Sequence, residues 1–170
     1  STPGAKDVGI EFYTFSKTFN MAGWRLAFAA GNDQMIEALN LIQDHLFVGI
    51  FPALQEAGIA ALLDPKSEEA VAQLNATYDS RRDAFVQAAA KIGWQAFPSR
   101  GSFYAWMPVP EGYTSESFAD LLLEKAHVAV APGKGFGPAG DAYVRNGLLV
   151  EPERLVEAVN RIANLHLFNN

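Results

Sequence analysis

The sequence predicts an α/β fold, because apolar, β-prone runs alternate with amphipathic helical patterns along the whole chain. The 170 residues are 49% hydrophobic and 12% aromatic, which provides enough apolar surface for a buried core. The pattern changes near residues 50–65: two apolar strands precede this region, and a small α+β layer of strands and helices follows it. We therefore expect the end of one larger domain followed by a smaller second domain.

The first third of the chain predicts two strands and a helix. Residues 9–15 form an apolar run that is expected to be a short buried strand, and residues 24–30 form the second strand. Both are expected to belong to a larger parallel sheet. The turn at residues 31–33 offers an N-cap to an amphipathic helix over residues 33–46.

Two further helices are predicted in the middle of the chain. Pro52 suits the first turn of a helix that continues through the Ala- and Leu-rich residues 53–63. Ser67 is expected to cap a long helix over residues 67–92, and Gly93 is expected to end it.

The last part of the chain alternates strands and helices. Short strands are predicted at residues 94–97, 102–107, 128–131 and 142–150. Helices are predicted from Thr114 to about residue 125 and from Pro152 onward, with a glycine-rich loop at residues 132–141. This loop satisfies GxGxxG over residues 135–140, but a strand follows it instead of a helix, so no dinucleotide site is expected.

Composition argues against several classes of function. The net charge is −6 and the longest basic cluster is Arg81-Arg82, so nucleic acid is not an expected partner. The chain has no cysteine and its three histidines lack the spacing of a metal site, so no metal is expected. No apolar run reaches the roughly 18 residues that span a bilayer, so we expect a cytoplasmic protein without a membrane partner.

The stretch Thr14-Phe15-Ser16-Lys17-Thr18-Phe19-Asn20-Met21-Ala22-Gly23-Trp24-Arg25 is the strongest candidate for chemistry. Lys17 stands between hydroxyl residues directly after an apolar run, a setting that suits an amine for reaction with a carbonyl group. From the residues alone, the alternative for Lys17 is an ordinary exposed lysine at a strand-to-turn junction. The alternative for Arg25 is a surface arginine at the start of a strand.

This string closely resembles the lysine signature of the class I/II aminotransferases, which are pyridoxal-phosphate enzymes of fold type I. The departures are mild, with Thr14 where serine is usual and Ala27 where glycine is usual. The resemblance covers essentially the whole chain and implies the C-terminal part of such an enzyme, whose first half would lie outside it. It implies that residues 1–50 end the large cofactor domain, that residues 51–66 form an interdomain helix, and that residues 67–170 form the small C-terminal domain.

The resemblance also assigns roles in the signature stretch. Lys17 would form the Schiff base with pyridoxal 5'-phosphate and then move a proton between the substrate α-carbon and the cofactor. Arg25 and Thr14 would bind the cofactor phosphate, and Ser16 would add a third donor.

Arg145 is the fifth candidate. It lies in a strand that otherwise alternates apolar residues, where a charge usually marks an exposed edge. The resemblance instead implies that Arg145 binds the substrate α-carboxylate as a bidentate pair. Asn146 departs from the pattern, because the family usually has an apolar residue there.

The implied activity is transfer of an amino group from an amino acid to a 2-oxo acid, in a homodimer. In its detailed sequence, the chain is most similar to the bacterial methionine-salvage and diaminopimelate-type transaminases. A β-C–S lyase or a racemase of the same fold would use the same lysine and phosphate site, and a non-catalytic aminotransferase-like binding module is a further alternative. Because the residues that hold the cofactor ring would lie outside this chain, we expect negligible transaminase activity from it alone. We also expect residues 9–50 to leave apolar surface uncovered, so that the chain self-associates or needs the other half.

Overall fold

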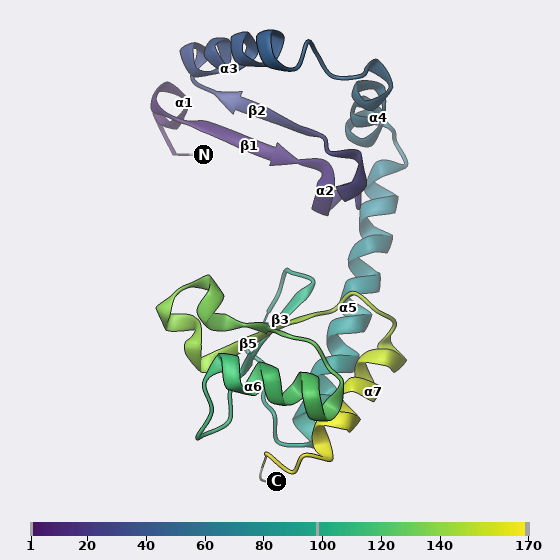
Figure 1. Cartoon of the computed structure of the whole chain (residues 1–170). Coiled ribbons are helices and arrows are strands. Elements are labelled where there is room, and N and C mark those ends of the chain that lie inside the picture. The colour runs from purple at the N-terminus through teal and green to yellow at the C-terminus, as the bar shows by residue number, and fades with distance from the viewer. Residues whose placement is uncertain (1, 98, 169–170) are drawn as a thin grey trace. The chain divides into compact units, whose positions relative to one another are not determined.

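The structure is a computed structural model that describes residues 2–97 and 99–168, and Figure 1 shows its elements. The chain divides into two compact units, Ser1–Leu74 and Asn75–Asn170, and the division falls inside a long helix. Both units combine helices with strands, so the predicted α/β class is confirmed. Within the part of the chain that the structure describes, no helix is both long and apolar enough to cross a membrane. The domain limits expected at residues 50 and 66 stay predictions.

The first unit contains a two-stranded hairpin with helices before, within and after it. Its elements are α1 (Ala5–Val8), β1 (Ile10–Thr14), α2 (Phe15–Thr18), the 3₁₀ turn η1 (Ala22–Trp24), β2 (Ala27–Gly31), α3 (Asp33–Leu46) and α4 (Pro52–Leu63). β1 and β2 pair antiparallel, with Ile10 opposite Gly31 and Thr14 opposite Ala27. The expectation of a parallel arrangement is therefore wrong for this pair, because residues 15–26 turn back instead of crossing over the sheet.

The apolar surfaces of this unit are more exposed than the sequence suggested. In β1, Phe12 keeps 64% of its surface exposed. The amphipathic helix α3 has no buried residue, and Leu41 and Leu46 are exposed. The expectation that residues 9–15 form a buried strand is therefore wrong, although Phe15 itself is buried. Apolar composition identifies a surface that favours burial, whereas burial itself requires a partner.

Helix starts in this unit follow their predicted signals with one exception. α3 begins after Asn32, whose side-chain oxygen accepts a hydrogen bond from the Met35 N–H at 3.1 Å. Pro52 occupies the start of α4, as predicted. The long helix α5 (Ser67–Lys91) begins at Ser67, but this residue is not its cap. The Ser67 hydroxyl donates to the Ala60 carbonyl at 3.2 Å instead, so the predicted capping role is wrong.

The second unit packs helices against a three-stranded antiparallel sheet with strand order β3-β5-β4. Its elements after α5 are β3 (Tyr104–Pro108), α6 (Ser115–Leu121), the π-helix η2 (Leu122–Ala126), β4 (Ala131–Pro132), the 3₁₀ turns η3 (Gly133–Phe136) and η4 (Pro138–Ala142), β5 (Tyr143–Gly147) and α7 (Pro152–Ala163). The central strand β5 pairs with both neighbours and therefore fixes the position of every residue along it.

The core of the second unit lies between the sheet and the helices. Trp94 is 1% exposed, and its indole N–H donates to the Pro108 carbonyl at 2.8 Å. Its ring lies against Phe118 and stacks on Phe168, with centroids 6.0 and 5.2 Å away. Met107 of β3 is fully buried in the same cluster. This core supports the sheet from one side.

Several predicted boundaries in the second unit need correction. Residues 94–97 form no strand, because Trp94 enters the core and its backbone N–H bonds to Ala89 at the end of α5. The strand expected at 128–131 shortens to Ala131–Pro132, and the glycine-rich loop contains two 3₁₀ turns. Thr114 caps α6 as predicted, but the helix passes into η2 after Leu121. Gly93 has φ 82° and follows the end of α5, so the predicted stop is confirmed.

Candidate active site

Four of the five predicted site residues lie at one connection, between β1 and β2: Thr14, Ser16, Lys17 and Arg25. Thr14 ends β1 and caps α2. Its hydroxyl donates to the Ser16 Oγ at 2.9 Å and accepts from the Ser16 N–H at 3.2 Å. Lys17 follows on α2 with an exposed side chain. Two hydroxyls and an amine therefore lie within one turn of chain.

Phe15 anchors this connection. It is 3% exposed, and its N–H donates to the Leu26 carbonyl at 3.2 Å, which joins the two ends of the connection. Its own carbonyl accepts from the Phe19 and Met21 N–H groups at 3.3 and 3.4 Å. Its ring also packs against Phe28 of β2, with centroids 5.9 Å apart. The loop that carries the candidate residues is therefore folded over a small apolar centre.

Helix α4 closes this centre through a glycine. Gly58 is buried, and a Cβ added there would lie 2.7 Å from Leu26 Cδ2 and 3.4 Å from Phe15 Cζ. A Cβ at the first of these distances would force the Leu26 side chain to shift, so the residue without a Cβ permits the close approach. The packing of α4 thus helps to determine the shape of the lysine loop.

Arg25 stands at the other end of the connection in a left-handed backbone conformation, with φ 54° and ψ 42°. This conformation costs a residue with a Cβ about 1–2 kcal/mol, so the surrounding loop imposes it. The Arg25 Nη1 donates to the Ala22 carbonyl at 3.0 Å, and the side chain is exposed. Because Thr14 pairs with Ala27, Arg25 begins close to the Thr14 and Ser16 hydroxyls.

Arg145 belongs to the second unit, on the central strand β5. It lies opposite Trp106 of β3 and Ala131 of β4, which contradicts the edge-strand interpretation of this charge. Its guanidinium carbon lies 4.0 Å from the centre of the Tyr104 ring and 4.3 Å from that of Phe136. Among the ion pairs of the described residues, none involves Arg145.

Sequence reasoning missed the residues that hold the loop beside Arg145. Ser115 is fully buried at the start of α6, and its hydroxyl donates to Asp141 Oδ1 at 2.8 Å. The same hydroxyl accepts from the Lys134 N–H at 3.2 Å. Hydrogen bonds from Ser115 hold the pKa of the Asp141 carboxyl below its ordinary value. Nothing in the sequence marks Ser115, because residues 115 and 141 meet only through the fold.

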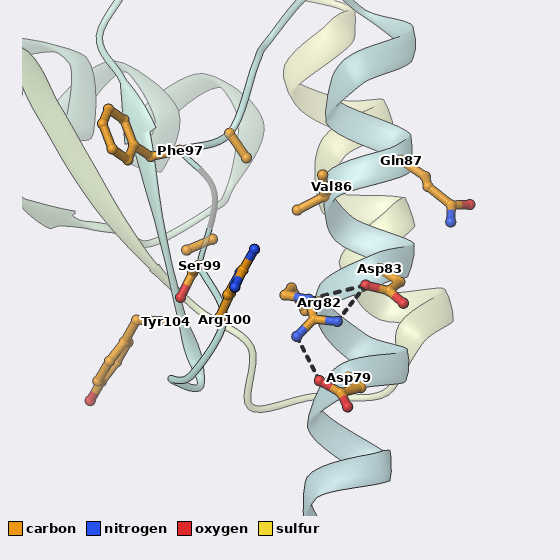
Figure 2. Close-up of a pocket in the computed structure, with 11 residues that line it drawn as sticks. Asp79, Arg82, Asp83, Val86, Gln87, Phe97, Ser99, Arg100 and Tyr104 are labelled. Carbon is orange, nitrogen blue, oxygen red and sulfur yellow. Dashed lines mark hydrogen bonds and ion pairs between the residues drawn. The ribbon is translucent and has the colours of Figure 1, made fainter.

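A cavity lies in the second unit, between α5 and the loop before β3 (Figure 2). It has a volume of about 800 Å³. Figure 2 shows Arg82 on its wall, bonded to Asp79 at 2.6 Å and to Asp83 at 2.9 Å. The hydrogen bond to Asp83 is the main reason that the pKa of Arg82 is raised. Arg82 therefore pairs with two carboxylates of its own helix.

Comparison with known proteins gives a consistent result. The chain matches the family described as aminotransferase class I and II over residues 4–162. It is 60% identical over 167 residues to the L-glutamine--4-(methylsulfanyl)-2-oxobutanoate aminotransferase of Bacillus subtilis (strain 168), covering 98% of this chain and 42% of that protein. It is 47% identical over 160 residues to an LL-diaminopimelate aminotransferase of Moorella thermoacetica, covering 94% and 40%. The chain thus spans about two fifths of the length of these curated relatives.

Solved structures resemble the whole chain as well. The apo structure of BacF from Bacillus subtilis has a TM-score of 0.92 and 46% identity, and the match covers 99% of this chain and 43% of that one. An aromatic aminotransferase from Pyrococcus horikoshii OT3 has a TM-score of 0.91 and 35% identity, covering 97% and 44%. The sequence comparison and the structure comparison therefore agree on the same group of proteins.

Proposed function

Because the chain belongs to the class I and II aminotransferase family, we propose that residues 14–25 and Arg145 form part of the active site of a pyridoxal-phosphate aminotransferase. Aminotransferases of this family use pyridoxal phosphate to transfer an amino group from an amino acid to a 2-oxo acid. The observation that carries the proposal is the connection between β1 and β2, which gathers a lysine, two hydroxyls and an arginine over Phe15.

The donor set of this connection suits the cofactor phosphate. The Thr14 and Ser16 hydroxyls are hydrogen-bonded to each other at 2.9 Å, and both can turn to donate to an anion. The exposed Arg25 guanidinium adds a planar pair of donors that matches phosphate oxygens. The loop imposes a left-handed backbone conformation on Arg25. This supports a role in phosphate binding, for which the guanidinium must be held in a defined place.

Lys17 and Arg145 take the remaining roles. Lys17 supplies the amine that anchors the cofactor and moves the proton at the substrate α-carbon. Arg145 binds the substrate α-carboxylate, and its lack of an ion pair among the described residues leaves its charge available. When bound, pyridoxal phosphate supplies the electron-accepting ring that makes the α-proton removable.

For substrates, we propose glutamine as amino donor and 4-(methylsulfanyl)-2-oxobutanoate as acceptor. This choice rests on the relative at 60% identity, against 47% for the diaminopimelate aminotransferase. We also propose a cytoplasmic homodimer. Exposed apolar side chains support an interface between subunits, since Phe47 and Phe51 are each 69% exposed.

A chimera tests the function directly. In it, this chain replaces the matching 167 residues of the Bacillus subtilis relative. We expect the chimera to convert 4-(methylsulfanyl)-2-oxobutanoate to methionine with glutamine and added cofactor, and Lys17→Ala to abolish turnover. Circular dichroism checks that both proteins fold. A folded chimera that forms no methionine but releases a thiol from an S-alkylcysteine would indicate a β-C–S lyase, and equal turnover after Lys17→Ala would exclude the role of Lys17.

A further inference from the structure

We propose that Phe136 and Tyr104 are positioning residues that hold the Arg145 guanidinium for its carboxylate. The inference rests on the proposed function, in which Arg145 binds the substrate carboxylate. It adds two aromatic rings from different elements, β3 and the 3₁₀ turn η3, to the residues on which substrate binding depends. We call Arg145 with these two rings the arginine clamp.

The sheet determines that these side chains share a face. Along β5, Val144 and Asn146 are buried, whereas Arg145 between them is only partly buried and points to the opposite side. Trp106 lies directly opposite Arg145 in the register, and Tyr104 lies two residues from Trp106 on β3. The outer face of the sheet therefore presents an arginine among aromatic rings.

The distances indicate that the rings lie against the guanidinium. Its central carbon lies 4.0 Å from the Tyr104 ring centre and 4.3 Å from the Phe136 ring centre, well within the range of a cation–π contact. All N–H donors of a guanidinium lie in its plane. A ring that lies against the flat surface of a guanidinium leaves these in-plane donors available, and a carboxylate binds to that edge in bidentate fashion.

Phe136 occupies a position that ordinary core packing does not explain. It keeps 54% of its surface exposed, yet its ring contacts both Arg145 and Trp106, the latter with centroids 5.9 Å apart. The turn that carries it is anchored on both sides. Before Phe136, the Lys134 N–H bonds to Ser115, and after it Asp141 bonds to the same serine. The ring is thus held at the arginine by a loop that is tied to α6.

A further close contact keeps the two ends of this loop together. A Cβ on Gly133 would collide with the Gly140 carbonyl oxygen, and a Cβ on Gly140 would collide with that of Gly133. Glycine at both positions lets the backbones touch. A free arginine side chain loses rotamer entropy when it is fixed. The clamp fixes Arg145 before the substrate arrives, so this loss does not weaken binding of the carboxylate.

Side-chain NMR of the isotope-labelled 170-residue chain tests the clamp. Ring currents should shift the Arg145 side-chain proton resonances upfield in the wild type, and Phe136→Leu should reduce that shift. Titration with 4-(methylsulfanyl)butanoate follows binding at the Arg145 Nε–H, with the neutral 4-(methylsulfanyl)butanamide as the reference. We expect Phe136→Leu to weaken carboxylate binding about tenfold and Phe136→Tyr to restore it.

Phe97→Leu is the matched control, because Phe97 is 60% exposed and contacts Tyr143 on β5 instead of Arg145. It should leave both the Arg145 resonances and the carboxylate affinity unchanged. Equal affinities for wild type and Phe136→Leu would overturn the clamp while leaving the carboxylate role of Arg145 intact. A wild type that responds equally to the acid and the amide would overturn that role, on which the clamp rests.

Discussion

At the scale of single residues, β5 places two unlike polar side chains next to each other. Arg145 lies on the outer face among aromatic rings, whereas Asn146 turns toward the core and is 5% exposed. The Asn146 amide nitrogen is buried and has no hydrogen-bond partner among the described residues. A buried donor without a partner costs about 1–3 kcal/mol, so an apolar residue would suit this position better.

Asn146→Leu should therefore stabilise the chain by about 1 kcal/mol, because it removes an unsatisfied amide from the core. A cavity of about 230 Å³ beside Asn146 offers room for the larger side chain. Urea unfolding followed by circular dichroism measures the change, and Asn146→Ala serves as the control that removes the amide without filling space. A midpoint that falls with leucine would mean that the amide has a partner in solution, such as a buried water.

At the scale of elements, the two loops that carry the candidate residues are held by contacts from a neighbouring helix. α4 supports the lysine loop through Gly58, and α6 supports the loop of Phe136 through Ser115. Gly58 permits a close approach, whereas Ser115 supplies a hydroxyl that bonds to the loop at two points. The geometry of the site thus depends on residues that carry no chemistry themselves.

Gly58→Val should destabilise the first unit by about 1–3 kcal/mol, since it forces new methyl groups against Leu26 and Phe15. Urea unfolding monitored by tryptophan fluorescence, to which Trp24 of the same loop contributes, measures the effect. Ala53→Val is the matched control: it places the same β-branched residue on an exposed position of α4. Equal losses in the two variants would contradict the close packing at Gly58.

The stability contributed by the hydrogen bond between Ser115 and Asp141, which holds the loop of Phe136, should depend on pH. Hydrogen bonds from Ser115 lower the pKa of Asp141 from its ordinary value of 3.8, so the ionised carboxylate is favoured in the folded state. The resulting stability is complete above that ordinary value and is lost as the pH falls through the lower folded-state pKa.

Asp141→Asn should therefore be less stable than the wild type at neutral pH, and the difference should shrink as the solution is acidified below about pH 4. Thermal unfolding as a function of pH measures this difference. Ser115→Ala should reduce the same pH-dependent part, because it removes the hydroxyl donor and keeps the backbone N–H donor. A difference between wild type and Asp141→Asn that persists in acid would contradict the assigned hydrogen bonds.

Much of this architecture was predictable, and the exceptions have physical reasons. The local signals correctly predicted the helix limits at Asn32, Thr114 and Gly93, because caps act within a few residues. Residues 94–97 were predicted as a strand because their apolar pattern suits both a strand and a buried turn. The contacts of Phe136 and Ser115 were not predictable, since they join residues far apart in the sequence.

At the scale of the whole molecule, the two units differ in how they use apolar side chains. The second unit has an enclosed core that includes Trp94, Met107 and Phe118, each 0–1% exposed. The first unit keeps many large apolar side chains exposed instead, in β1, α3, α4 and the segment that joins the two helices. Such a surface favours association with another apolar surface.

We therefore expect the chain to self-associate as its concentration rises, through the first unit. Sedimentation velocity over a range of concentrations measures this behaviour. A double variant, Phe47→Ser with Phe51→Ser, should reduce association, because both side chains are 69% exposed. Leu123→Ser, which changes a side chain in the second unit that is 54% exposed, is the control. A single monomeric species at every concentration would contradict this expectation.

The central claim is that Lys17, at the connection of the β1–β2 hairpin, is the lysine that holds the cofactor. Mixing the chain with pyridoxal phosphate, reducing with borohydride and mapping the labelled peptides by mass spectrometry tests this claim most directly. The other lysines of the sequence, Lys6, Lys66, Lys91, Lys125 and Lys134, serve as internal references. We expect the label to fall mainly on Lys17 and to be lost in Lys17→Ala. A label spread evenly over all six lysines, or unchanged in total by Lys17→Ala, would contradict it.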